Sequence, residues 1–209
     1  MGQYYSPTLV NASGKMVGWL NSHDYEDEGL KLMEHSCMGK LLVNAVCSQI
    51  ADNPMRIAWI GDYSEEPWDG TEPYQKKISQ EEFDSFYKKA WGESQKKYQI
   101  HPEPLEGLDR PEDFTGRYLV NHTRKSFVDL GEFQQENGWQ EERNGEKYWC
   151  SIHPLPLLTA CGNGRGSGDY HEGYPDWDKC GLWAFDLIEF STSVPDGYEK
   201  ETYHFKETN

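Results

Sequence analysis

The sequence contains no long apolar run, and none approaches the ~20 residues that a helix needs to cross a bilayer. Its first residues also lack the basic and apolar regions of a secretory signal peptide. We therefore expect a soluble, cytoplasmic protein with no membrane partner. Only five cysteines are present, an odd number with irregular spacing. In a chain without an export signal, such cysteines are expected to be reduced thiols.

Basic residues are also scarce. The 20 lysines and arginines are outnumbered by 36 aspartates and glutamates, which gives a net charge of −16. A surface of this sign repels a phosphate backbone, so direct binding to nucleic acid is disfavoured. It favours a basic protein partner, including one that itself binds nucleic acid. Solubility alone is the alternative explanation of the same charge.

The mean hydropathy is low, at −0.88, but the chain is rich in aromatic residues, which make up 14% of it. Each buried aromatic ring removes ~150–250 Å² from water, so these rings are sufficient for most of a core. The composition therefore predicts a folded protein and excludes a disordered one.

Two segments of the chain resemble each other. Leu9–Leu20 aligns without a gap over Leu119–Leu130, with a shared Leu-Val-Asn start, a shared lysine and a shared final leucine. In each copy an apolar segment ends at an asparagine (Asn11 or Asn121), a polar turn follows and a second apolar segment begins. This pattern is typical of a β-hairpin. Further matches later in the chain, in the same order, favour an internal duplication.

The other elements follow from periodicity. Each unit is expected to close with a strand, at Met55–Tyr63 and at Gly181–Ser191, where bulky strand-forming side chains are concentrated. A capping box at Ser79 and Glu82 begins a helix that we extend to Tyr98, followed by a linker. The sequence thus predicts an α+β fold in which two related β-rich units pack together with covering helices. Residues 1–70 and 116–209 form the repeat units, residues 71–115 form a helical insertion and linker, and all three share one compact domain.

A glycine-rich segment, Gly162–Tyr170, is the first candidate site. Alternating glycines let the main-chain N–H groups converge on an anion, and an arginine within the segment is available to pair with it. The expected ligand contacts are Asn163, Gly164, Arg165, Gly166, Asp169 and Tyr170. The segment matches neither a Walker A loop nor a dinucleotide-binding fingerprint, so a purely structural loop is the alternative.

Chemistry near this loop is less clearly marked. His153, His171 and Asp169 are candidates for a general base and acid if they converge in space. For His153 the alternative is a local hydrogen bond at the end of an element. The cysteines and histidines of this region do not form the two clustered pairs of a zinc site, so we expect no metal and no cofactor. The nucleophile and metalloprotease motifs are missing as well, which favours a protein that is not an enzyme.

The chain opens with Met-Gly-Gln-Tyr-Tyr and carries Gly-Asn-Gly-Arg-Gly-Ser-Gly-Asp-Tyr at Gly162–Tyr170. In these two motifs it resembles a set of small acidic proteins from bacteria and their phages. The resemblance spans both units but does not extend clearly to the helix after Ser79. It implies no activity. What it implies is a genomic setting among phages and mobile elements.

Two hypotheses of different class follow. In the first, the chain is a non-enzymatic binding protein, an inhibitor of a host defence system (anti-CRISPR-like) or an immunity-type protein. Acidic residues beside aromatic ones suit a basic partner, because the rings anchor and the acids steer the approach. The expected partner contacts are Glu65, Glu66, Trp68, Asp69 and Tyr74. In the second, the chain is an enzyme or sensor that binds a nucleotide or another phosphorylated small molecule at Gly162–Tyr170.

Overall fold

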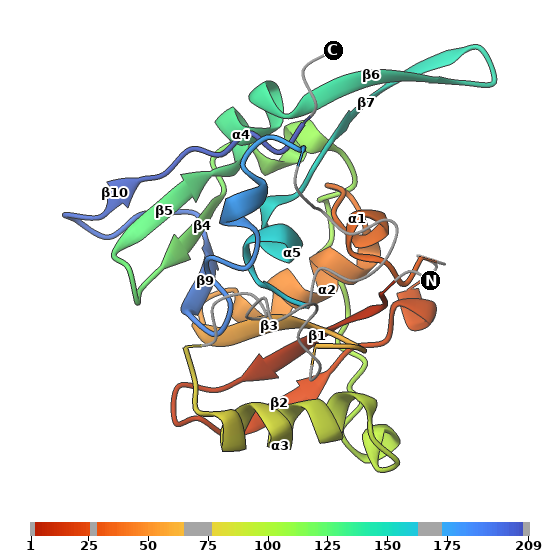
Figure 1. Ribbon diagram of the computed structural model, residues 1–209. Helices are drawn as coiled ribbons and strands as arrows, with labels where there is room; N and C mark the ends of the chain where they lie inside the picture. The colour runs from red at the N-terminus through yellow and green to blue at the C-terminus, as the bar shows by residue number, and fades with distance from the viewer. Residues whose placement is uncertain (1–2, 26–28, 65–76, 163–172, 207–209) are drawn as a thin grey trace.

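The computed structural model describes residues 3–25, 29–64, 77–162 and 173–206 (Figure 1). The mixed α+β class expected from the sequence is confirmed. The strands are β1 (Tyr5–Val10), β2 (Met16–Trp19), β3 (Met55–Gly61), β4 (Tyr118–Asn121), β5 (Ser126–Asp129), β6 (Gly138–Arg143), β7 (Glu146–Ser151), β8 (Ala160–Cys161), β9 (Leu187–Ser191) and β10 (Glu199–Lys200). The α-helices are α1 (Leu32–His35), α2 (Leu41–Ile50), α3 (Gln80–Trp91), α4 (Leu130–Glu136) and α5 (Pro154–Leu158).

One sheet joins the two halves of the chain, with the strand order β10-β5-β4-β9-β3-β1-β2 and with β8 paired to β3 beyond the end of β9. β3 and β9 meet in the middle through the pairs Met55–Ile188 and Arg56–Leu187. β6 and β7 form a second, two-stranded sheet. All described strands except β6 and β7 therefore belong to one central sheet.

The two segments that resemble each other in sequence have the same secondary structure. β1–β2 and β4–β5 are antiparallel hairpins, and the first strand of each pairs antiparallel with a later strand, β3 or β9. Asn11 Oδ1 accepts a hydrogen bond from Lys15 N, and Asn121 Oδ1 accepts one from Arg124 N. Each asparagine thus holds its turn through its side chain, which replaces a main-chain acceptor. The two turns differ by one residue, since Val10 lies opposite Met16 but Asn121 lies opposite Ser126. A common origin by duplication stays a prediction.

Apolar clusters lie on both sides of the sheet. On one side α2 packs on the central strands through Leu42, Val46 and Ile50, in a cluster that also holds Trp59. On the other side Phe83, Phe86 and Ala90 of α3 pack against a second cluster, and α3 lies along the β1–β2 hairpin (Figure 1). Alternate residues of a strand point to opposite faces, so β3 contributes Ile57 and Trp59 to the first cluster and Ala58 and Ile60 to the second.

α3 begins where the sequence predicts. Ser79 accepts a hydrogen bond from Glu82 N, and the Glu82 carboxylate accepts one from Ser79 N, which completes the capping box. The helix ends at Trp91 and not at Tyr98, because Gly92 takes an extended conformation (φ −82°, ψ 179°). The bond from Gly92 N–H to Lys88 O is the last hydrogen bond of the helical pattern. A short 3-10 helix at Gln95–Lys97 follows. The apolar stripe faces the core as expected, but Trp91 is only partly buried.

Replacing Trp91 tests how α3 is held to the sheet. The indole Nε1 donates to Ile60 O at 3.0 Å, so the ring contributes both packing and a hydrogen bond to β3. We expect Trp91→Ala to lower the free energy of unfolding by about 2–3 kcal/mol, which is less than for a fully buried ring. Trp91→Phe keeps the ring packing and should cost about 1 kcal/mol, the net value of one hydrogen bond. Urea denaturation measures both, and equal losses for the two variants would contradict the packing contribution.

Candidate functional site

Most of the site residues predicted from the sequence lie outside the described residues. These are the ligand contacts Asn163, Gly164, Arg165, Gly166, Asp169 and Tyr170, the candidate base His171, and the partner contacts Glu65, Glu66, Trp68, Asp69 and Tyr74. Among the described residues, no three His, Cys, Asp or Glu side chains come together as metal ligands would. No cysteine of the described residues forms a disulfide.

His153 is the one predicted catalytic candidate that the structure describes, and it is fully buried. Its Nδ1 accepts a hydrogen bond from Leu155 N at 3.2 Å, which caps the N-terminus of α5, and its ring meets Phe114 edge-on. Burial lowers the pKa of His153 from 6.5 to about 3, since an imidazolium loses its hydration in the core. A general base has to reach its substrate, so this geometry favours the structural role.

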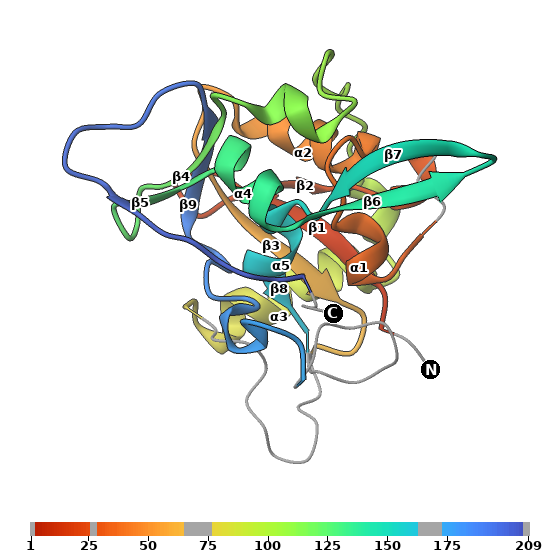
Figure 2. The ribbon, with the colours of Figure 1, turned by 90° about the horizontal axis from the view of Figure 1, so that it is seen from above.

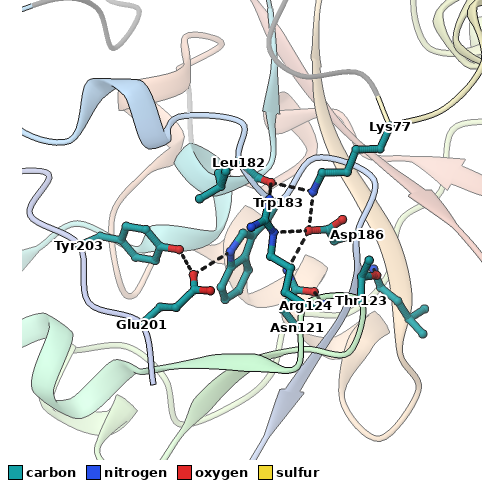
Figure 3. A network of polar contacts seen from close by, with 10 residues as sticks. Lys77, Asn121, Thr123, Arg124, Leu182, Trp183, Asp186, Glu201 and Tyr203 are labelled. Atoms are coloured by element: carbon teal, nitrogen blue, oxygen red, sulfur yellow. Dashed lines mark hydrogen bonds and ion pairs between the residues drawn. The ribbon is translucent and has the colours of Figure 1, made fainter. Parts of the chain in front are cut away.

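A buried carboxylate forms the centre of a polar network in the core (Figure 3). The Asp186 side chain is 1% exposed. Its Oδ2 accepts hydrogen bonds from Asn121 Nδ2 at 2.9 Å and Arg124 Nε at 3.0 Å, and lies 2.5 Å from Lys77 Nζ. Its Oδ1 is buried and has no hydrogen-bond partner among the described residues. The buried carboxylate is thus paired with two cations, and a buried charge requires such pairing.

The turn before Asp186 is strained. Phe185 has a φ of 62°, a left-handed conformation that is unfavourable for a bulky side chain, and its N–H donates to Ile57 O at 2.7 Å. Lys77 Nζ and Arg124 Nη2 both donate to Leu182 O, so the two cations also hold the turn. Burial lowers the pKa of Lys77, although Asp186 opposes that shift. The network therefore joins three distant segments around this turn, and strain of this kind is commonest at functional sites.

The strand expected at Gly181–Ser191 is wrong for residues 181–186, which form this turn. The strand β9 begins only at Leu187, because residues 181–186 form turns in which Ala184 N donates to Gly181 O and Asp186 N to Trp183 O. Trp183 Nε1 donates to Glu201 Oε2, which also accepts from the Tyr203 hydroxyl (Figure 3). Burial, followed by this contact with Glu201, raises the pKa of Tyr203. Polar contacts thus fix this segment at Leu182, Trp183 and Asp186.

The β6–β7 hairpin projects away from the rest of the protein as an arm (Figures 1 and 2). Its turn, Asn144-Gly145, has positive φ at both residues (54° and 80°), the combination that a two-residue type I′ hairpin requires. Gln140, Glu142 and residues 144–149 are exposed. The sequence patterns do not predict an arm, although Asn-Gly between segments that contain Trp and Tyr is a strong hairpin signal.

Two aromatic side chains are exposed on the arm, Tyr148 at 46% and Trp149 at 44%. The Trp149 indole lies over Gly138, where a Cβ would come within 2.4 Å of the ring, and its Nε1 donates to Gln134 Oε1 at 2.8 Å. The Tyr148 hydroxyl donates to the Glu146 carboxylate. Each ring is thus held in place by a hydrogen bond to a neighbouring side chain, while much of its surface faces water.

A cleft of about 760 Å³ adjoins the arm. One wall is β7 from Lys147 to Ser151, with Trp139 and Glu141 of β6, and the opposite wall is formed by residues 37–40 and 109–112. Three cations line it, Lys40, Arg110 and Lys147, together with three carboxylates, Asp109, Glu112 and Glu141. A concave, partly apolar surface of this volume with a few polar groups is the usual form of a binding site.

Comparison of the chain with protein-family models, with curated protein sequences and with solved structures gives no match. No helix in the described part of the chain has the length and apolar character needed to span a membrane.

Proposed function

We propose that the chain is a binding protein that holds a basic partner protein through the β6–β7 arm. The observation that carries this proposal is the pair of oriented, exposed rings of Tyr148 and Trp149 on an arm that also bears glutamates, in a chain of net charge −16. Hot spots of protein interfaces are enriched in tryptophan and tyrosine, because a rigid ring buries a large area with little loss of conformational freedom.

The glutamates of the arm favour a basic partner. Glu141, Glu142 and Glu146 lie within a few residues of the two rings along the hairpin, and they outnumber its two basic residues, Arg143 and Lys147. Acidic groups around an aromatic anchor raise the rate of encounter with a basic surface and disfavour an acidic one. A second copy of this chain also carries −16, so two copies repel each other, and the arm suits a different protein better than its own copy.

A basic protein that binds nucleic acid is the partner class that this charge fits best. An acidic protein on such a surface competes with the nucleic acid for the same positive groups. The resemblance in Met1–Tyr5 and Gly162–Tyr170 to proteins of bacteria and phages supports a bacterial nucleic-acid-binding defence protein as the target. The role that follows is inhibition by occupation, without catalysis.

Alanine variants of the two rings test the proposal. The chain is immobilised, partners are recovered from a bacterial host lysate at low salt and identified, and the affinity of the purified partner is then measured. We expect Tyr148→Ala and Trp149→Ala each to weaken binding by about thirtyfold, as the loss of a hot spot of about 2 kcal/mol would. Binding should also weaken as salt screens the acids.

Trp177→Ala is the matched control, because Trp177 is 43% exposed and belongs to a 3-10 helix that is not part of the arm. It should leave the affinity within about twofold, as a surface change outside the interface does. A partner that binds both arm variants as tightly as it binds the unchanged chain would refute the proposed site. A partner lost equally from Trp177→Ala would point to a different face.

A further inference from the structure

The outer edge of β7 exposes main-chain groups that have no partner in the hairpin. The two-residue turn makes Arg143–Glu146 a hydrogen-bonded pair, so the pairs alternate from there along the hairpin. Glu142–Lys147 and Gln140–Trp149 are then non-hydrogen-bonded pairs, whose N–H and C=O groups point away from the opposite strand. Ser151 has the same parity, and its outward C=O does accept a hydrogen bond from Met38 N at 3.0 Å.

At the base of this edge the described chain makes a single β-bridge and no further strand. Cys37 forms an antiparallel bridge with Ile152, and Met38 N binds Ser151 O. At Gly39 the chain leaves β7, with a φ of 85° and with the Cβ position 2.3 Å from Asp109 O, so only glycine fits this exit. Beyond it, the edge from Trp149 to Lys147 has no strand beside it among the described residues, and this edge lines the cleft.

We propose that this cleft receives an extended segment of the partner, which adds to β7 as a third strand in line with Cys37–Met38. The outward N–H and C=O groups of Lys147 and Trp149 would then pair with the segment's main chain. An exposed strand edge is the usual template for such addition. Alternate side chains of the segment would lie over the face of the arm that carries Trp139, Glu141 and Tyr148.

The segment's chemistry follows from the charge around it. The preference for a basic segment comes from the whole chain, whose net charge is −16. The lining of the cleft is itself balanced, with Asp109, Glu112 and Glu141 beside Lys40, Arg110 and Lys147. The apolar wall of Trp139 and Tyr148 suits apolar side chains at alternate positions. An extended peptide in which valine alternates with arginine is therefore a suitable probe. This inference rests on the proposed function and specifies how the arm binds.

A pair of proline variants tests the mode of binding. Lys147→Pro removes an outward N–H from the β7 edge, and Glu142→Pro removes the matching N–H from the opposite edge, at the other member of the same cross-strand pair. Neither N–H bonds within the hairpin, so both prolines are compatible with it, as prolines at strand edges are. Lys147→Gln removes the lysine charge and keeps the N–H. Each change is made in the full chain.

Fluorescence anisotropy with the labelled valine–arginine peptide gives the affinities. Lys147→Pro should weaken binding by about tenfold or more, and Glu142→Pro and Lys147→Gln should remain within about twofold of the unchanged chain. In the unchanged chain, bound peptide should protect the amides of Lys147 and Trp149 from hydrogen exchange and leave those of Gln140 and Glu142 unprotected. A peptide that does not bind, that binds Lys147→Pro unchanged, or that protects the β6 amides overturns strand addition.

The two proposals fail in different ways. If Lys147→Pro holds the natural partner as tightly as the unchanged chain does, while Tyr148→Ala and Trp149→Ala release it, then the arm binds through its rings and strand addition is wrong. If none of the arm variants affects the partner, the proposed function itself fails. If Lys147→Pro and the ring variants all release the partner and Glu142→Pro does not, both proposals are supported.

Discussion

Replacing Asp186 with alanine is expected to lower the free energy of unfolding by about 3 kcal/mol. Removing one partner of a buried ion pair usually costs ~3–5 kcal/mol, because the remaining charge stays buried without compensation. Here Lys77 and Arg124 are 27% and 30% exposed, so water offsets part of the loss and places it at the lower end of that range. Asn121 also loses the acceptor for its amide.

Two further variants separate the charge from the fold. Asp186→Asn keeps the shape and one acceptor oxygen, so its loss should be smaller than that of Asp186→Ala. Asp178→Ala breaks an exposed pair with Lys179 and should change stability by less than about 0.5 kcal/mol. Chemical denaturation at neutral pH compares the three. If Asp186→Ala costs no more than Asp178→Ala, the network does not hold the turn at residues 181–186.

Local signals predicted the parts of the fold that depend on neighbours in the sequence. The β1–β2 and β4–β5 hairpins followed from apolar segments around an asparagine turn, and the start of α3 from its capping box. The strand expected at Met55–Tyr63 is present as β3, which ends at Gly61. Its bulky residues pack alternately on the two faces of the sheet. In each case the residues that determine the structure lie within a few positions of one another.

Gly181–Ser191 shows why the rest could not be predicted in this way. Trp183 and Phe185 suggested a strand because both are bulky, but Trp183 packs in the cluster with Trp59 and Phe185 in the cluster with Phe86. The turn between them exists because Lys77 and Arg124, distant in sequence, meet Asp186. Contacts of this range leave no periodic pattern in the segment itself.

The arm was missed for a different reason. Its strands are too polar to show the alternation of a half-buried strand, since Glu141, Glu142 and Glu146 take positions where apolar residues would be expected. The turn Asn144-Gly145 was the only clear signal. Tyr148 and Trp149 are exposed because no other part of the described fold covers them fully. Exposure of this kind is a property of the assembled structure, so the candidate binding surface could not be located from the sequence.

Acid is expected to destabilise the protein through His153. Above pH 6.5 the ring is neutral in the folded and the unfolded chain, and it contributes no pH dependence. Below pH 6.5 the unfolded chain binds a proton at His153, but the folded chain does not until about pH 3, because the pKa of the buried ring is lowered to about 3. Stability therefore falls as the pH drops through this window, at about 1.4 kcal/mol per pH unit. At about pH 4.5 the loss from this group is about 3 kcal/mol.

His153→Asn isolates this contribution, because asparagine also accepts a hydrogen bond at a helix N-terminus and does not titrate. The variant should be less stable than the unchanged chain at neutral pH, since it loses the ring contact with Phe114. Its loss of stability between neutral pH and about pH 4.5 should be smaller by about 3 kcal/mol. Denaturation at both pH values measures the difference, and NMR titration of the imidazole gives the pKa directly. A titration midpoint near pH 6.5, or equal acid losses in the two chains, would show that His153 is not held neutral by the core.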